Sequence, residues 1–298
     1  MILKRILPLS VLLSLTAIFS SCEMTINVDL PKQEPVLVVN AHAESATPLL
    51  VDVTLSQSVL NNDPGVFPPV KNARVLLIRN GIDSSYADYF DPLKQYALSL
   101  IPAEGDHFEL QVLHPDYPAV RAEAQIPRAL KLNNIKLEHR VEKDLDGNDL
   151  ARLSFDISDR PDEVDYFSLE LKYMGTDSIA HSACFQSDDP VFLRRGEMQE
   201  PGNSRWFCNE FYFDDHYMTS HPYRVTIYLI ESEFQLAEEV ILRLRTHEMS
   251  SYLYRTSLEN QMAVYGNPFA EPVLVYSNIE NGLGIFSGSS TSESRIRW

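Results

Sequence analysis

Short segments in which apolar and polar residues alternate recur along most of this chain, with turn-forming residues between them. In the stretch 51–55, Val-Asp-Val-Thr-Leu, every second residue is apolar. This period of two predicts a β-strand with one buried face, because successive side chains of a strand point to opposite faces of the sheet. Short strands at this spacing, with no helical period between them, favour a mainly β protein with sandwich-like layers. Further segments of this kind lie at 73–83, where the strand runs into an Asn-Gly turn, and at 107–114, 151–157, 165–174 and 223–231.

The segment 126–140 reads as a connector, and we expect it to separate two β-rich domains, 22–127 and 128–298. In the first domain, the strand at 69–75 has the pattern Pro-x-x-x-Ala-x-Val, and the strand at 105–112 has the pattern Gly-x-x-aromatic-x-Leu-x-Val. These patterns resemble immunoglobulin-like and carboxypeptidase-regulatory-like modules. The resemblance implies that the first domain is an immunoglobulin-like β-sandwich.

One helix is predicted in the second domain, over about 247–265. Thr246 or Ser250 can cap its start, and Gly266 followed by Pro268 ends it. We expect the buried face of this helix to be a stripe of side chains at helical spacing. The stripe consists of Met249, Tyr252, Leu253 and Thr256.

The first 21 residues have the pattern of a lipoprotein signal peptide. Lys4 and Arg5 precede a mostly apolar stretch, 6–19, which is shorter than the roughly 20 residues that cross a bilayer. Two serines and Cys22 follow, and this order resembles a bacterial lipobox, whose cysteine is acylated after cleavage. Lipidation of Cys22 would attach the folded body to a membrane without a spanning helix. The alternative is a plain secretion signal with an incidental cysteine.

The charge of the chain argues against nucleic acid as a partner. Removal of 1–21 removes two of 25 basic residues and none of 42 acidic ones, so the net charge changes from −17 to 23 − 42 = −19. An acidic body repels both nucleic acid and anionic lipid head groups.

Two cysteines, Cys184 and Cys208, follow Cys22 in the chain. Because an exported chain meets an oxidising compartment, we predict a disulfide between these two. Buried free thiols or a metal site are the alternatives, although no Cys-x-x-Cys spacing favours a metal.

The sequence predicts no metal, no cofactor and no catalytic site. Asp144, Asp146 and Asn148 occupy three positions of a calcium loop, but Phe155 stands where that loop needs Glu, and an Asp-Gly hairpin turn explains the same residues. Neither a Gly-x-Ser-x-Gly elbow nor a Gly-rich phosphate loop is present in the sequence. A loop cluster that a metal or solvent could equally use comprises Asp214, Asp215, His216 and His221.

Aromatic residues gather between positions 206 and 223. Exposed aromatic side chains on a rigid sheet make a good binding surface for a protein or a sugar. We therefore single out Trp206, Tyr212 and Tyr217 as candidate partner-binding residues. In the alternative interpretation, all the aromatic side chains of this span belong to the core.

The most specific motif lies at 267–286, where Asn-Pro-Phe-x-Glu-Pro precedes Ser-Asn-Ile-x-x-Gly-x-Gly-Ile-Phe. This motif resembles that of the Bacteroidota lipoproteins of domain of unknown function forty-two forty-nine, and the stretches 22–41 and 159–171 resemble two further parts of that family. We interpret the Asn and Gly pattern as structural, because two glycines allow close backbone approach. The matching residues are Asn267, Pro268, Phe269, Glu271, Pro272, Ser277, Asn278, Ile279, Gly282, Gly284, Ile285 and Phe286.

The resemblance implies a location and a neighbour rather than a reaction. It implies a lipid-anchored protein of the outer membrane, at the cell surface rather than the periplasmic face, beside a TonB-dependent receptor. We therefore expect a non-enzymatic accessory that helps such a receptor to capture or gate its ligand. The alternative is a structural or adhesive, fimbrial-type surface lipoprotein. A hydrolase is the third possibility, and the sequence favours it least.

Overall fold

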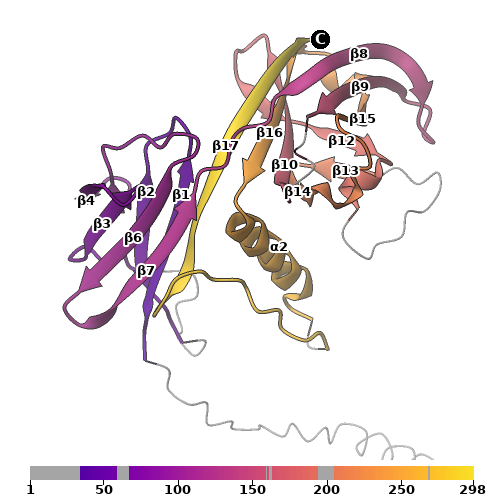
Figure 1. Ribbon diagram of the computed structural model, residues 1–298. Coiled ribbons are helices and arrows are strands. Elements are labelled where there is room, and N and C mark those ends of the chain that lie inside the picture. The colour runs from indigo at the N-terminus through magenta and orange to yellow at the C-terminus, as the bar shows by residue number, and fades with distance from the viewer. Residues whose placement is uncertain (1–33, 59–66, 159, 161–162, 194–204, 268) are drawn as a thin grey trace, which may run out of the picture. The chain divides into compact units, whose positions relative to one another are not determined.

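The computed structural model describes residues 34–58, 67–158, 160, 163–193, 205–267 and 269–298. Strands predominate in these residues, and the α-helix among them is α2, Met249–Val264 (Figure 1). The mainly β class and the helix predicted near the carboxyl terminus are therefore confirmed. Cys22 and the predicted signal peptide lie outside the described residues. No helix in the described part of the chain is long and apolar enough to cross a bilayer.

A first apolar core lies between strands of the amino-terminal half. Leu37, Val39 and Ala41 of one strand are buried in it, as are Phe108 and Leu110 of another. These side chains occupy alternate positions, as the period of two in the sequence predicts. The strands around this core are β1 (Leu37–Glu44), β2 (Leu50–Leu55), β3 (Arg74–Arg79), β4 (Asp83–Phe90), β5 (Gln95–Ala97), β6 (His107–His114) and β7 (Tyr117–Gln125).

A second apolar core is rich in phenylalanine. The ring of Phe192 contacts those of Phe185 and Phe213, at centroid distances of 5.5 and 5.4 Å. The strands around it are β8 (Leu132–Lys143), β9 (Asp149–Ile157), β10 (Tyr166–Gly175), β11 (Ala180–Ser182), β12 (Cys184–Ser187), β13 (Arg205–Cys208), β14 (Glu210–Asp214), β15 (Tyr223–Ile230) and β16 (Ala237–His247). Short 3-10 helices in this half are η1 (Pro190–Phe192), η2 (Asp215–Tyr217) and η3 (Glu231–Phe234).

The strands form two sheets. One has five strands in the order β13-β12-β15-β9-β8, and it covers one side of the second core. The other has twelve strands and runs β11-β10-β16-β17-β1-β2-β5-β4-β3-β6-β7, with β14 paired to β10. The larger sheet therefore lines both cores.

The long strand β17, Leu283–Arg297, connects the two cores (Figure 1). It pairs in parallel with β1 and antiparallel with β16. Phe286 of β17 is buried in the first core, whereas Ile296 packs against the second. Because both are even-numbered residues of one strand, a single face of β17 serves both cores. Separate folding of the predicted domains 22–127 and 128–298 thus stays a prediction, since one strand belongs to both.

The opposite face of the larger sheet is polar where β1, β17 and β16 meet. His42, Ser287 and Ser289 lie on it, together with Arg245 and His247. Helix α2 contacts β17, β14, β10 and β16 on this side. A helix that lies over a polar surface turns its polar side chains, rather than an apolar stripe, toward that surface. We therefore expect the face of α2 that contacts the sheet to be polar.

The predicted buried stripe of α2 is therefore wrong in part. Met249 is 52% exposed, whereas Ser250 and Ser251 are buried. Tyr252 does contact the sheet, because its ring lies 4.8 Å from that of Tyr166. The sequence pattern assumes an apolar neighbour, and α2 has a polar one.

The Asn and Gly residues of the carboxyl-terminal motif have structural roles. A Cβ on Gly284, whose φ is +113°, would lie 2.1 Å from the carbonyl oxygen of Val39, and a Cβ on Gly282 would lie 2.7 Å from that of Leu37. The Asn278 side chain accepts a hydrogen bond from the Phe286 amide (3.0 Å) and donates one to the Phe286 carbonyl (2.7 Å). The prediction that these glycines permit close approach of two backbones is confirmed.

Candidate functional site

An open pocket of about 640 Å³ lies on the polar face of the larger sheet, next to α2. We call it the α2 pocket. It is lined by residues of β1, β2 and β17, by Gln95 of β5, and by residues of β14, β16 and α2. Its volume is within the range of roughly 300–1,000 Å³ that is typical of small-molecule sites.

Strand register brings two polar side chains together at one end of this lining. Asn40 of β1 lies directly opposite Asp52 of β2 in the antiparallel pair, so both side chains project from the same face. The Oδ1 atom of Asn40 is buried and has no hydrogen-bond partner among the described residues. Burial raises the pKa of the Asp52 carboxyl, and no cation among the described residues compensates its charge.

A chain of hydrogen bonds connects the sheet to α2. The Ser168 hydroxyl donates to Glu210 Oε1 (2.5 Å), so its oxygen is left to accept a hydrogen bond from the Nε2–H group of His247 (2.7 Å). Nδ1 of His247 then accepts from the Ser251 hydroxyl (3.2 Å). The network thus holds His247 as one neutral tautomer. Burial is the main cause that lowers the pKa of His247 well below its usual range.

His42 has a similar environment on the neighbouring strand. Its Nδ1 and Nε2 atoms lie 3.0 Å and 2.7 Å from the hydroxyl oxygens of Ser287 and Ser289 on β17. Burial lowers the pKa of His42, and the nearby Arg245 acts in the same direction. Both histidines of the α2 pocket are therefore neutral at pH 7.

The two arginines of the α2 pocket differ in their partners. The Arg245 guanidinium pairs with Glu210 and, at 3.5 Å, with Glu44. Arg255 of α2 lies over the ring of Tyr212, 5.3 Å from its centroid. Its Nε atom is buried without a hydrogen-bond partner, and no ion pair involves Arg255 within the described part of the chain. Glu210 and Glu44 compensate the charge of Arg245, whereas no carboxylate among the described residues forms an ion pair with Arg255.

Comparison with known families agrees with the motif in the sequence. Residues 23–295 match the family described as Domain of unknown function (DUF4249). This chain belongs to the DUF4249 family. No curated protein matches the DUF4249 chain. Among solved structures, a crystal structure of a Salmonella alpha-2-macroglobulin mutant is similar with a TM-score of 0.25 and 12% identity, covering 77% of this chain and 14% of the other. This chain thus spans a small part of that protein, and the likeness carries no argument about function.

The DUF4249 chain has a serine–histidine pair that the sequence analysis did not identify. Ser251 and His247 are four residues apart, and the spacing becomes meaningful only because β16 ends at His247 and α2 begins two residues later. A general base works best with a pKa near the working pH, whereas burial holds His247 far below it. We therefore interpret this pair as a structural link between β16 and α2.

The three predicted partner-binding aromatics do not form one surface. Phe207 and Phe213 point into the second core from the two sheets that enclose it, so their neighbours Trp206 and Tyr212 face outward on opposite sides. Trp206 is 48% exposed, whereas Tyr212 is buried beneath Arg255. The half-buried ring of Tyr217 stacks edge-on against His216. Sequence alternation identifies outward residues but not which sheet they belong to.

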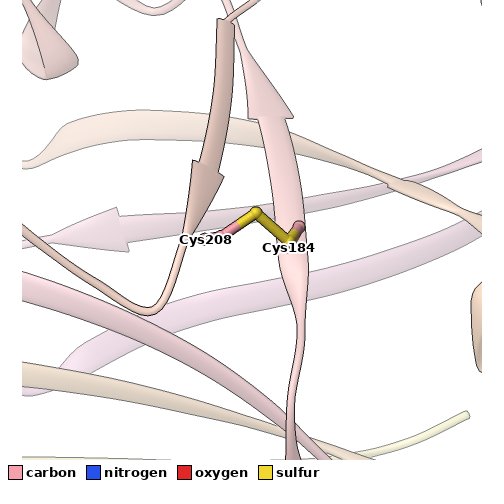
Figure 2. The surroundings of a disulfide bond; sticks show 2 residues. All are labelled: Cys184 and Cys208. Atoms are coloured by element: carbon pink, nitrogen blue, oxygen red, sulfur yellow. A yellow bond between two sulfur atoms is a disulfide. The ribbon is translucent and has the colours of Figure 1, made fainter.

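The structure joins Cys184 and Cys208 by a disulfide between the paired strands β12 and β13 (Figure 2). The two Cα atoms are 4.2 Å apart, and the bond closes a sequence separation of 24 residues. This site is part of the five-stranded sheet, so its role is structural.

The residues weighed as metal ligands make local hydrogen bonds instead. The Asp144 carboxylate accepts from the backbone amides of Asp146 and Asn148, as expected for the turn between β8 and β9. The Asp214 carboxylate accepts from the His216 amide at the start of η2. Within the described ranges, no group of three metal-ligating side chains is assembled.

A second feature is a row of exposed apolar side chains at the end of α2 and in the irregular segment after it. Phe269 is 96% exposed, and the others are similarly open to solvent. Isolated apolar residues on a surface are common, but several within a short segment indicate a contact site. We call this the apolar segment; it comprises Met262, Tyr265, Phe269 and Leu274.

Proposed function

We propose that this DUF4249 protein is a lipid-anchored, non-enzymatic binding protein of the outer membrane that captures a small ligand for a TonB-dependent receptor. The observation that carries the proposal is the α2 pocket with its uncompensated polar groups. Asn40 Oδ1 and Arg255 Nε are buried without partners, and burying such groups costs free energy. Both atoms are closed to solvent, so a ligand removes this cost by drawing the Asn40 and Arg255 side chains toward the pocket, which favours a binding role for the pocket.

The chemistry of the pocket supports binding rather than catalysis. Glu210, Ser168 and His247 satisfy one another, and both histidines are held neutral. A fixed, satisfied network positions a ligand well, and burial lowers the pKa of both histidines, the residues that most often move protons near pH 7. We therefore propose that the protein binds its ligand without catalysing a reaction.

The anchor and the location remain part of the proposal. Acylation of Cys22 would hold the body at the outer membrane, on the cell surface, where a receptor meets its ligand. The net charge of −19 after removal of 1–21 (23 basic minus 42 acidic residues) does not favour adsorption to anionic lipid, so the lipid must supply the attachment. We also propose that 22–127 has an immunoglobulin-like topology, completed by β17.

The apolar segment is our candidate contact with the receptor. Exposed aromatic and aliphatic anchors supply most of the binding energy of a protein interface. Phe269 and Tyr265 are the largest of these side chains, and they follow a helix that lines the pocket. Docking through this segment would bring the α2 pocket close to the receptor.

The test is affinity purification of the full-length tagged protein from detergent-solubilised membranes of its native host, with mass spectrometry. We expect a TonB-dependent barrel to co-purify with the wild type, and Phe269→Ser with Leu274→Ser to reduce its yield at least tenfold. The exposed pair Ile82→Ser and Leu145→Ser, far along the sequence in two other loops, is the matched control. If no barrel accompanies a folded, membrane-bound protein, the receptor proposal is abandoned.

A structural or adhesive role is the alternative, and the sheet edges bear on it. Polymerising subunits join through exposed strand edges. The long edge strand β8 pairs with β9 in a register that shifts between Asn133 and Lys136 and again between Glu138 and Glu142. Such irregularities and charges hinder edge-to-edge pairing. The register shifts of β8 therefore argue against polymerisation through this edge.

A further inference from the structure

We propose, building on the binding role above, that the ligand of the α2 pocket is a small zwitterion of the amino-acid or short-peptide class. Its carboxylate pairs with Arg255, and its ammonium group is held by Asn40 and Asp52. The proposal rests on which charges of the pocket are already compensated within the fold and which are not.

Arg255 supplies the site for the anionic end. Arg245 already pairs with Glu210 and Glu44, so it has little to offer a ligand. Arg255 has its Nε buried without a partner, and its guanidinium is held against the Tyr212 ring. A guanidinium binds a carboxylate through two parallel N–H donors, and stacking on an aromatic ring leaves those donors free at its edge.

Asp52 and Asn40 supply the site for the cationic end. Both offer oxygen acceptors, from adjacent positions of two paired strands. The Asn40 acceptor is buried without a donor, and the Asp52 carboxylate has neither a hydrogen bond nor an ion pair among the described residues. An ammonium group has three donors and one positive charge, so it pairs with the Asp52 carboxylate and reaches the buried Asn40 oxygen once that side chain turns toward the pocket.

The charge balance of the pocket favours a zwitterion over a ligand that carries only negative or only positive charge. Arg245 and Arg255 give +2, while Glu44, Asp52 and Glu210 give −3, and the sum is −1. A purely anionic ligand would meet net repulsion. A purely cationic ligand would satisfy Asp52 but leave the Arg255 Nε buried and unpaired. A zwitterion compensates both.

The volume and the remaining lining set the size of the ligand. A pocket of about 640 Å³ has room for more than one amino-acid residue. Pro48, Leu50, Tyr254 and Ile285 also line it, and they offer apolar contacts for side chains. This combination suits a short peptide bound through its two termini, with tolerance for its side chains.

The test is equilibrium dialysis of the purified full-length mature protein in detergent, with mass spectrometry of the retained molecules. The probes are a mixture of the free amino acids and a pool of tripeptides randomised at every position. Matched tripeptide pools carry an acetylated amino terminus or an amidated carboxyl terminus. We expect retention of unblocked probes, and a loss of about 10–100-fold for either blocked pool, since each block removes one charged contact.

Two variants assign the contacts to residues. Asp52→Asn and Arg255→Gln should each weaken retention by a similar factor, whereas Asp116→Asn and Arg297→Gln, outside the pocket, should not. Asp52→Asn should also raise the thermal midpoint of the ligand-free protein, because it removes a half-buried, uncompensated charge. A merely structural Asp52 would give the opposite shift. Circular dichroism verifies that each variant is folded.

The outcomes separate this inference from the proposed function. Equal retention of blocked and unblocked pools, or no retention of any probe by folded protein, overturns the zwitterion assignment while leaving the receptor proposal intact if the barrel still co-purifies. Retention that depends on Asp52 and Arg255 supports the assignment even where no barrel is found.

Discussion

Acidification should destabilise this protein through the two buried histidines of the α2 pocket. Burial lowers the pKa of both His42 and His247 below the ordinary value of 6.5. In the unfolded chain both take up protons as the pH falls through 6.5, whereas in the folded chain they take them up only at lower pH. Stability is therefore complete above about pH 6.5 and decreases as the pH falls below it.

The magnitude follows from the number of protons involved. Each histidine that stays neutral in the fold costs about 1.4 kcal/mol of unfolding free energy for each pH unit below the unfolded pKa. If both histidines stay neutral in the fold, the loss between pH 6.5 and 5.5 is about 2 kcal/mol, a large part of a typical stability of roughly 5–15 kcal/mol.

Neighbouring charges decide whether the histidines stay neutral. Arg245 and Arg255 oppose protonation of both rings, whereas Glu44 and Glu210 favour it at His42. His42 also lowers the pKa of His247. We therefore expect His247 to contribute more than His42 to the loss of stability at low pH.

Buried carboxyl groups have the opposite effect on stability at low pH, so their contribution must be distinguished from that of the histidines. Burial raises the pKa of Glu248 and Asp189, so these groups take up protons in the fold first and gain stability on acidification. A comparison of variants removes this contribution, because it is common to all of them.

The assay is urea unfolding at pH 7.5, 6.5 and 5.5 of the wild type, His247→Gln, His42→Gln and the exposed control His216→Gln. His247→Gln loses the hydrogen bonds to Ser168 and Ser251, so it should be less stable at pH 7.5 by about 1–3 kcal/mol. Its loss between pH 7.5 and 5.5 should be smaller than that of the wild type by about 1.4 kcal/mol in total. An unchanged pH dependence in both histidine variants would refute the reasoning.

Three further outcomes are expected. Gly284→Ala should destabilise the fold by about 3 kcal/mol or more in urea unfolding, because its Cβ would overlap the carbonyl of Val39 at a φ of +113°. Replacing Cys184 and Cys208 by serine should cost about 3 kcal/mol by loop-closure entropy, and peptide mapping without reductant should find the two peptides linked in the wild type. Cys22→Ala should release the protein into the soluble fraction or leave it unprocessed, as fractionation and mass measurement would show; normal processing with retained membrane attachment would contradict lipidation.

The strands of the two cores could be predicted because burial imposes a local period. Val51 and Val53 are buried while Asp52 between them faces the pocket, as their alternation indicates. The extent of α2 could be predicted for a similar reason, since Gly266 ends its pattern. Its buried face could not, because the apolar stripe rule assumes an apolar partner and α2 lies on serines, histidines and arginines.

The candidate site could not be predicted because its residues come from distant parts of the chain. Asn40 and Asp52 become neighbours through a strand pair, and Arg255 reaches them only after β17 has placed α2 over the sheet. None of these residues has an unusual local pattern. Asp52, like Thr54, occupies an ordinary polar position of an alternating strand, so no signal in the sequence distinguished it.

The shared strand β17 has a consequence for how the chain acquires its fold during synthesis. Polypeptides leave the ribosome amino end first, yet the parallel partner of β1 emerges long after β1 itself; His42 and Ser287 are 245 positions apart. Until then one edge of β1 is unpaired and able to bind other strands. Since contacts of such long range form slowly, the polypeptide passes through a vulnerable interval in which a chaperone has a clear substrate. Premature termination anywhere before β17 would lengthen that interval indefinitely and direct the fragment to proteolysis.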